Sequence, residues 1–259
     1  MAFALITGAS GGIGLSMAHE LAKRKIDLLL VARSEEKLLT LQKDLSNKFG
    51  VRVEYLCKDL SAEQSAAAIK EWIDKNNFSV HILINNAGYG VWGAVENTAV
   101  EKLTNMMQLN MLTLVELCHA FIPELKKHTQ SYILNVASTA AYQAVPTLST
   151  YAATKAFVIL FTRGLRRELK KSSVSVTCVS PGATSTSFID RAGMSAMKDR
   201  AEKFSMTPEA VAKIAIDGMF HKKAEVITGF ANWLSAQLTY WVPKSIPEKI
   251  AESLYRTKP

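Results

Sequence analysis

The sequence contains little cysteine, and this excludes several classes of protein. Its three cysteines, Cys57, Cys118 and Cys178, have no Cys-x-x-Cys spacing, and each lies in an apolar stretch. We therefore expect neither a disulfide framework nor a cysteine-ligated metal site, but buried, reduced thiols in a cytoplasmic protein. The five histidines lack the close pairing of a zinc site, so we predict no metal.

Long apolar runs are also scarce. The N-terminal segment Met1–Ile6 has no basic region before it and passes directly into a glycine-rich turn, so we predict a strand rather than a signal sequence. Val226–Val242 carries no charge over 17 residues, which is short for a membrane span of about 20 residues. We interpret this segment as a final strand followed by an apolar helix packed on the fold. A membrane-surface or substrate-channel role is the alternative.

No linker, repeat or low-complexity segment divides the chain, and its 259 residues suffice for one large domain. The net charge of +8 suits a polyanionic ligand such as a phosphorylated nucleotide or coenzyme A, or an ordinary solvated surface. Because the basic residues are spread along the chain without interleaved aromatics, we predict no nucleic-acid partner.

Short apolar runs alternate with helical patterns almost from end to end. The predicted strands are Ala2–Thr7, Asp27–Ala32, Val51–Cys57, Val80–Asn85, Ser131–Ala137, Ser173–Val179 and Glu225–Thr228. The predicted helices are Gly12–Lys25, a helix capped by Ser34 that ends near Phe49, a helix capped by Ser61 that ends near Lys75, Glu101–His128 and Thr150–Lys171. Strands that are apolar throughout are buried on both faces. The order predicts an α/β fold with a Rossmann-type, doubly wound parallel sheet of about seven strands and helices on both faces.

A glycine-rich turn, Thr7–Gly14, follows the first predicted strand and opens the first helix. Glycine permits a tight turn and lets backbone N–H groups approach phosphate oxygens at a helix N-terminus. The spacing Gly8-x-x-x-Gly12-x-Gly14 differs from the more general G-x-G-x-x-G pattern, but its position predicts a site for the pyrophosphate of a dinucleotide.

The end of the second predicted strand indicates which dinucleotide is bound. Folds that prefer NAD place an acidic residue there to bind the ribose 2′-hydroxyl. This chain has Arg33 instead, and an arginine can pair with a 2′-phosphate. The sequence therefore favours NADP(H).

Three polar residues can act on a carbonyl or an alcohol. Tyr151 and Lys155 lie one helical turn apart, and Ser138 closes the fifth predicted strand. A free tyrosine has a pKa of about 10, and we expect the Lys155 ammonium to lower that of Tyr151. The Ser138 hydroxyl can hydrogen-bond the substrate oxygen. Beside a dinucleotide site, this set predicts hydride transfer.

These motifs, taken together, resemble the short-chain dehydrogenase/reductase family over nearly the whole chain. The matching pieces are Thr7–Gly14, Asp59-Leu60, Asn85-Asn86-Ala87-Gly88, Asn110, Ser138, Tyr151-x-x-x-Lys155, and Pro181-Gly182 with Thr184 and Thr186. The resemblance implies that Asn110 holds a water in a proton relay and that Lys155 also hydrogen-bonds the nicotinamide ribose. It places Asp59 and Leu60 at the adenine, residues 86–88 at its ribose, and residues 181–186 around the nicotinamide and its phosphate.

The expected catalytic residues are Ser138, Tyr151, Lys155 and Asn110. The residues expected to bind NADP(H) are Gly8, Ser10, Gly12, Ile13, Gly14, Arg33, Asp59, Leu60, Asn86, Ala87, Gly88, Tyr151, Lys155, Pro181, Gly182, Thr184 and Thr186. We predict an NADP-dependent carbonyl reductase or alcohol dehydrogenase. A nucleotide-sensing regulator or scaffold on the same fold is the alternative. Sugar-nucleotide epimerisation fits less well, because those relatives have another glycine spacing and a longer C-terminal domain.

The substrate region is expected between residues 187 and 207, which would form a lid rich in methionine and phenylalanine. Tyr89–Gly93 would form another side, so an acyl, steroid-like or lipid-like small molecule is plausible. The apolar residues 157–161 are consecutive, so they cover more than the helix face that packs on the sheet. The preceding helix has a similar set, and both helices are therefore expected to keep an unpacked apolar face. In the resembling family these two helices pair across a two-fold axis, which implies a homodimer or homotetramer.

Overall fold

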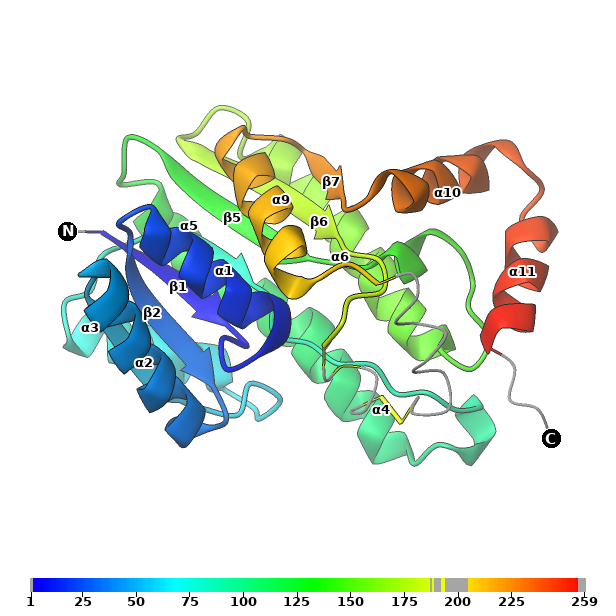
Figure 1. Ribbon diagram of the computed structural model, residues 1–259, viewed down its shortest axis with the longest axis horizontal. Helices are drawn as coiled ribbons and strands as arrows, with labels where there is room; N and C mark the ends of the chain where they lie inside the picture. The colour runs from blue at the N-terminus through cyan, green and yellow to red at the C-terminus, as the bar shows by residue number, and fades with distance from the viewer. Residues whose placement is uncertain (1, 187, 189–191, 194–204, 256–259) are drawn as a thin grey trace.

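The computed structural model describes residues 2–186, 188, 192–193 and 205–255, and within them it contains a seven-stranded parallel sheet (Figure 1). The strands are β1 (Phe3–Thr7), β2 (Asp27–Ala32), β3 (Val53–Cys57), β4 (Val80–Asn85), β5 (Ser131–Val136), β6 (Val174–Ser180) and β7 (Glu225–Ile227). Their order across the sheet is β3-β2-β1-β4-β5-β6-β7. The predicted doubly wound α/β fold is confirmed.

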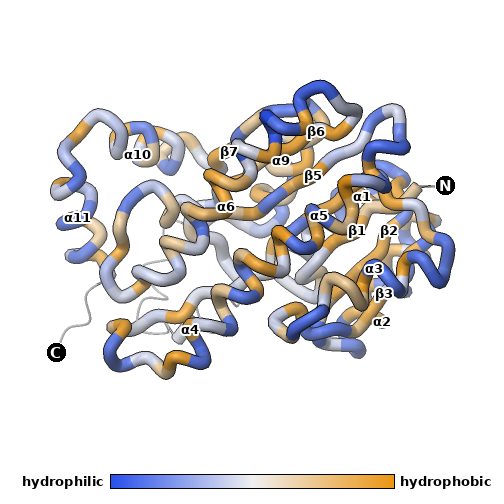
Figure 2. Tube along the Cα trace, turned by 180° about the vertical axis from the view of Figure 1, so that it is seen from behind, coloured by the Kyte–Doolittle hydropathy of each residue, from blue (hydrophilic) through white to orange (hydrophobic). Residues whose placement is uncertain are grey.

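Alternate residues of each strand enter two separate cores. In β1, Leu5 packs in one apolar cluster and Ile6 in the other, because successive side chains of a strand point to opposite faces. Both residues are fully buried. The unbroken apolar strands of the sequence are thus explained by burial on both faces, and Figure 2 shows the hydrophobic strands running through the middle of the protein.

Helices cover both faces of the sheet (Figure 1). On one face lie α1 (Gly12–Lys23), α2 (Glu35–Phe49) and α9 (Pro208–Phe220). On the other face lie α3 (Ser65–Lys75), α5 (Thr113–Leu125) and α6 (Ser149–Glu168). The strand order reverses between β1 and β4, and in open α/β sheets ligands bind at the carboxyl ends of the strands beside such a reversal.

The long helix predicted over Glu101–His128 is interrupted. It consists of α4 (Val100–Met107), a π-helical turn (Gln108–Leu112) and α5, which ends at Leu125. A π turn inserts an extra residue into the helical ladder and is frequent at functional sites. Here it buries Asn110, whose side chain is 1% exposed. The apolar periodicity of this segment gave no sign of the turn.

Two predicted caps are wrong in detail. The Ser61 side chain hydrogen-bonds Asp59 (Oγ to Oδ1, 2.7 Å), and α3 begins at Ser65 instead. Ser34 does precede α2, but its side chain makes no capping hydrogen bond. Cys57 is exposed rather than buried, because it ends the edge strand β3, whereas Cys118 and Cys178 are buried as expected.

The C-terminal segment forms β7 and then two helices, α10 (Phe230–Trp241) and α11 (Ser245–Tyr255), that extend away from the sheet (Figure 1). The interpretation of an apolar helix packed on the fold is therefore only partly correct. Ala236 and Thr239 of α10 are buried, but Phe230 is 76% exposed and Trp241 is 83% exposed. The apolar composition of α10 thus lies largely on its surface.

Among the described residues, no helix is both long and apolar enough to cross a membrane.

Candidate active site

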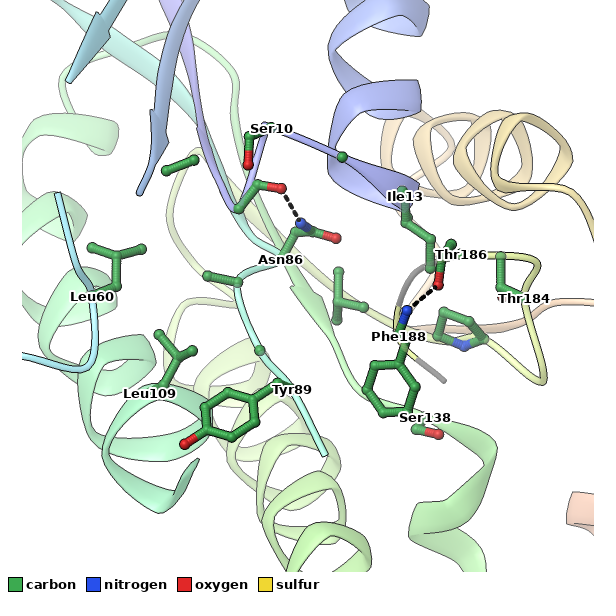
Figure 3. A pocket seen from close by; sticks show the side chains of 18 of the residues that line it. Ser10, Ile13, Leu60, Asn86, Tyr89, Leu109, Ser138, Thr184, Thr186 and Phe188 are labelled. Carbon is green, nitrogen blue, oxygen red and sulfur yellow. Dashed lines mark hydrogen bonds between the residues drawn. The ribbon is translucent and has the colours of Figure 1, made fainter. Parts of the chain in front are cut away.

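A cavity of about 600 Å³ opens along the carboxyl ends of the strands. It is lined from several elements that are far apart in the sequence (Figure 3). The predicted site residues that line it are Gly8, Ser10, Gly12, Ile13, Arg33, Asp59, Leu60, Asn86, Ala87, Gly88, Ser138, Tyr151, Lys155, Pro181, Gly182, Thr184 and Thr186. Gly14 and Asn110 lie behind this lining.

The glycine turn leaves no room for side chains at two positions. A Cβ on Gly14 would lie 2.4 Å from both the Asn86 Nδ2 atom and the Gly8 carbonyl oxygen. Gly8 has a φ of +68°, in the left-handed region that favours glycine. A Cβ there would lie 2.9 Å from Asn86 Nδ2. The turn therefore packs directly on the segment that follows β4.

The Asn86 side chain holds the glycine turn against the segment that follows β4. Its Nδ2 donates to the carbonyl oxygens of Thr7 (2.9 Å) and Gly8 (3.3 Å), one of which is drawn in Figure 3. The Thr7 hydroxyl oxygen accepts from the backbone N–H groups of Asn86 and Ala87, both at 3.0 Å. The Asn86 amide is thus engaged with the backbone of the glycine turn, and it holds two loops of the cavity together.

The end of the cavity beside β2 is rich in positive charge. Arg33, Lys37 and Lys58 all line it, next to Asp59. Burial would raise the pKa of Asp59, but hydrogen bonds from Ser61 and the charge of Arg33 outweigh this and lower it. Lys37 and Lys58 were not predicted to lie at this site. Lys37 could have been, because it follows Arg33 by four residues, in the first turn of α2.

Tyr151 and Lys155 lie together at the other end of the cavity, on one face of α6. Tyr151 is 7% exposed, Lys155 is 5% exposed, and the Lys155 Nζ lies 5.9 Å from the centre of the Tyr151 ring. The Lys155 Nζ donates to the Val136 carbonyl oxygen at the end of β5, at 2.9 Å. Ser138, two residues beyond that strand, also lines this end of the cavity, and its side chain acts to lower the pKa of the Tyr151 hydroxyl.

The pKa of Tyr151 differs from expectation. Burial raises it to about 12, and the hydrogen bond with Ser138 offsets this only in part. The predicted lowering by Lys155 is therefore wrong, because the ammonium group bonds to the Val136 carbonyl rather than to the phenol. Burial also lowers the pKa of Lys155, to about 8. Both groups are driven toward their neutral forms.

Asn110 lies close to Lys155, as the resemblance implied. Its Nδ2 donates to the Tyr89 carbonyl oxygen and to the Thr154 hydroxyl, both at 3.0 Å, and its Oδ1 accepts from the Tyr89 N–H at 3.2 Å. A Cβ on Gly88 would lie 3.0 Å from Asn110 Oδ1 and 3.2 Å from Lys155 Nζ. These two side chains thus converge on the backbone at Gly88.

The segment after β6 closes the side of the cavity. Thr186 Oγ1 accepts from the Phe188 N–H at 3.2 Å (Figure 3). Gly182 packs against α10, because a Cβ there would lie 2.2 Å from the Asn232 Nδ2 atom. Asn232 is held by its own bond to the Thr228 carbonyl oxygen, at 2.8 Å. The first turn of α10 therefore supports the cavity wall from behind.

The substrate side of Tyr151 is apolar. The Phe188 ring lies 5.4 Å from the Tyr151 ring, and both line the cavity with Tyr89 and Leu109. Leu109 comes from the π turn and was missed by the sequence analysis. Most of the predicted lid, residues 187, 189–191 and 194–204, lies outside the described residues.

Residues that could bind a metal ion are not gathered anywhere in the described part of the chain: no three His, Cys, Asp or Glu side chains come close enough together.

Comparison with known proteins identifies the family. Residues 2–196 match the family model of the short chain dehydrogenases. The NADP-dependent 3-hydroxy acid dehydrogenase of Schizosaccharomyces pombe is 31% identical, over 86% of this chain and 88% of that protein. The very-long-chain 3-oxoacyl-CoA reductase of Rattus norvegicus is 30% identical over 69% of this chain, which spans 58% of the rat protein. A short-chain dehydrogenase from Sphingobium yanoikuyae, solved in complex with NADPH, superimposes with a TM-score of 0.82 at 31% identity, covering 93% of this chain and 94% of that one. The chain belongs to the short-chain dehydrogenase family of oxidoreductases.

Proposed function

We propose that the protein is an NADPH-dependent reductase that converts the carbonyl group of an apolar small molecule to a secondary alcohol, and catalyses the reverse reaction. One observation carries this proposal: a single cavity is lined at one end by the glycine turn and at the other by Ser138, Tyr151 and Lys155. The cavity joins a dinucleotide site to groups that can move a proton. We infer that residues 1–259 act as one dinucleotide-binding and catalytic domain.

The residues present fit a dinucleotide. The turn keeps its tight packing against Asn86 only because Gly8 and Gly14 carry no Cβ, and the N-terminus of α1 adds partial positive charge that suits phosphate oxygens. Arg33, Lys37 and Lys58 suit a 2′-phosphate at the adenine end. A bound nicotinamide supplies the hydride that reduces the carbonyl carbon. Pro181, Gly182, Thr184 and Thr186 would hold it near Tyr151.

The chain's own residues handle the proton. Ser138 and Tyr151 would both hydrogen-bond the substrate oxygen, which polarises the carbonyl. Tyr151 then gives its hydroxyl proton to that oxygen as the alcohol forms. At neutral pH the Tyr151 phenol keeps its proton, as a proton donor must, and the raised pKa is consistent with this. Lys155 and Asn110 lie where a proton could be returned to the phenolate.

The cofactor preference rests on charge. The end of β2 carries no acidic side chain toward the ribose, and three cations line that part of the cavity. Two of the similar proteins support the same preference, since one is described as NADP-dependent and the other was solved with NADPH.

Replacing Arg33 with alanine is therefore expected to weaken NADPH binding by about 1.5–3 kcal/mol, the value of a hydrogen bond to a charged group. NADH binding is expected to stay nearly unchanged, because NADH lacks the 2′-phosphate. Dissociation constants from fluorescence titration test this. Lys43→Ala, an exposed lysine of the same helix region outside the cavity, is the control. Equal wild-type affinity for the two cofactors would overturn the preference.

The substrate is proposed to be acyl, steroid-like or lipid-like, because the surroundings of Tyr151 are aromatic and aliphatic. The relative described as a very-long-chain 3-oxoacyl-CoA reductase supports an apolar chain. The test is NADPH oxidation over a panel of ketones, 3-oxoacyl thioesters, steroids and sugars. Turnover of sugars alone would contradict the apolar class, and no turnover of any carbonyl would contradict the proposed activity.

We also infer a homodimer or homotetramer. On α6, Leu160 is 75% exposed and Phe157 is 38% exposed, and Leu112 of the π turn is 51% exposed. Phe161 is half-buried and packs against the core, so Leu160 is the better position for a test of the interface.

Leu160→Glu is expected to shift the protein toward a monomer of 28.5 kDa, because it places a charge in an apolar contact. Light scattering at micromolar concentration measures this. Leu39→Glu, at an exposed leucine on the opposite face of the sheet, should leave the mass unchanged. A wild-type mass of one chain would contradict the assembly.

A further inference from the structure

The last helix of the described chain reaches the surroundings of Tyr151. An apolar cluster, here called the Tyr151 cluster, has as its buried members Met106, Val145, Leu148, Tyr151, Ala152, Ala192 and Ala251. Tyr255 packs against this cluster, as do Tyr89, Trp92 and Phe188. Ala251 and Tyr255 belong to α11, about 100 residues beyond Tyr151 in the sequence. The C-terminal helix is therefore part of the apolar enclosure of the candidate catalytic tyrosine.

The end of α11 is held in place by the loop that precedes α6. The Thr147 hydroxyl donates to the Tyr255 carbonyl oxygen at 3.2 Å. The Thr147 carbonyl oxygen in turn accepts from the Gly93 N–H at 2.9 Å, and Gly93 ends the predicted substrate wall Tyr89–Gly93. Thr147 thus links the end of α11 to the predicted substrate wall Tyr89–Gly93.

The two faces of α11 differ. Ile246, Ile250 and Leu254 lie on its outer face, with exposures of 47%, 56% and 39%. Ala251 is 2% exposed and, with Tyr255 one turn later, faces the Tyr151 cluster. The pattern follows the helical period, since residues four apart share a face. Tyr255 is therefore on the inner face as a consequence of the register of α11.

Tyr255 and Tyr151 share one apolar cluster, so their phenols belong to the same poorly solvated region. The presence of Tyr255 adds to the rise in the pKa of Tyr151, after burial itself. Burial also raises the pKa of Tyr255. These directions agree with the packing, because they place both phenols in one poorly solvated region.

From this geometry we propose that Tyr255, which packs on the Tyr151 cluster behind the cavity lining, limits the size of the apolar group that can lie beside Tyr151. The inference rests on the proposed carbonyl reduction and adds a specificity-determining residue to it. A ketone whose oxygen meets Tyr151 and Ser138 has two flanking groups. The larger flank would press on the Tyr151 cluster, which Tyr255 supports from the side of α11.

The test compares Tyr255→Ala with Leu254→Ala, its exposed neighbour on the same helix. A series of unbranched methyl ketones of increasing length is reduced with NADPH, and kcat and KM are measured separately. For Tyr255→Ala we expect the preferred length to shift to longer ketones, with kcat/KM for the longest members rising about tenfold or more through KM. Leu254→Ala and Tyr255→Phe are expected to keep the wild-type length profile.

Two further measurements make the outcome decisive. The NADPH dissociation constant and Tm of each variant show that the fold and the cofactor site persist. The shift in Tm caused by each ketone reports its binding without turnover. If the wild type reduces no ketone, the proposed function fails while the binding series still tests Tyr255. An unchanged length profile in Tyr255→Ala, in both turnover and binding, would overturn the inference.

Discussion

Tyr151→Phe is expected to lower kcat for ketone reduction by about 10²–10⁴-fold, the contribution of a positioned general acid. NADPH binding is expected to change by no more than severalfold. The variant keeps the ring that packs 5.4 Å from Phe188 and removes only the hydroxyl that Ser138 contacts. Steady-state kinetics and a cofactor titration separate the two effects.

Tyr132→Phe provides a matched control for this variant. Tyr132 is the second residue of β5, at the opposite end of the strand from the cavity, and its ring packs against Phe220. Its loss of a hydroxyl is expected to leave kcat unchanged. Near-normal turnover in Tyr151→Phe would remove Tyr151 from the role of proton donor, whatever the effect on binding.

Gly14→Ala is expected to damage both stability and cofactor binding. The added Cβ would lie 2.4 Å from the Gly8 carbonyl oxygen, so the backbone of the turn must move. Overpacking of this kind costs about 1–3 kcal/mol, which in a chain of this size lowers Tm by about 2–12 °C. NADPH affinity is expected to fall at least tenfold, about 1.4 kcal/mol, because the displaced turn no longer fits the phosphates.

Gly11→Ala in the same turn is the control for stability. No atom lies within 4 Å of a Cβ built on Gly11, and its φ of −179° is extended backbone that any residue adopts. Its Tm without cofactor is expected to match the wild type. Equal Tm values for the two variants would show that the close approach at Gly14 is tolerated, and would contradict the packing argument.

Much of this fold follows from local patterns. Apart from Thr7 and Asp27 at their ends, β1 and β2 are apolar throughout because both faces are covered, and this pattern can be read from a single sequence. The glycine turn was also predictable, because its position between a strand and a helix restricts what it can bind. For the same reason, most of the predicted site residues line one cavity.

Other features depend on tertiary structure and cannot be predicted from the local sequence pattern. The π turn that buries Asn110 has the same residue types as an ordinary helix. The raised pKa of Tyr151 comes from burial and from the bond of Lys155 to Val136, and neither is visible in the Tyr-x-x-x-Lys spacing. Tyr255 reaches the site because α11 packs against the Tyr151 cluster. The assignment of the site residues and a cytoplasmic location remain predictions.

The position of the two C-terminal helices has a thermodynamic consequence. Asn232 of α10 fills the space beside Gly182, and Tyr255 of α11 packs in the Tyr151 cluster, so these helices contact both parts of the cavity. Their outer faces carry the exposed Trp241 and Ile250. A ligand inside the cavity that favours one placement of the helices therefore alters the affinity of any outer-face ligand that also prefers one placement. By linkage, the outer ligand changes the affinity of the inner one by the same factor.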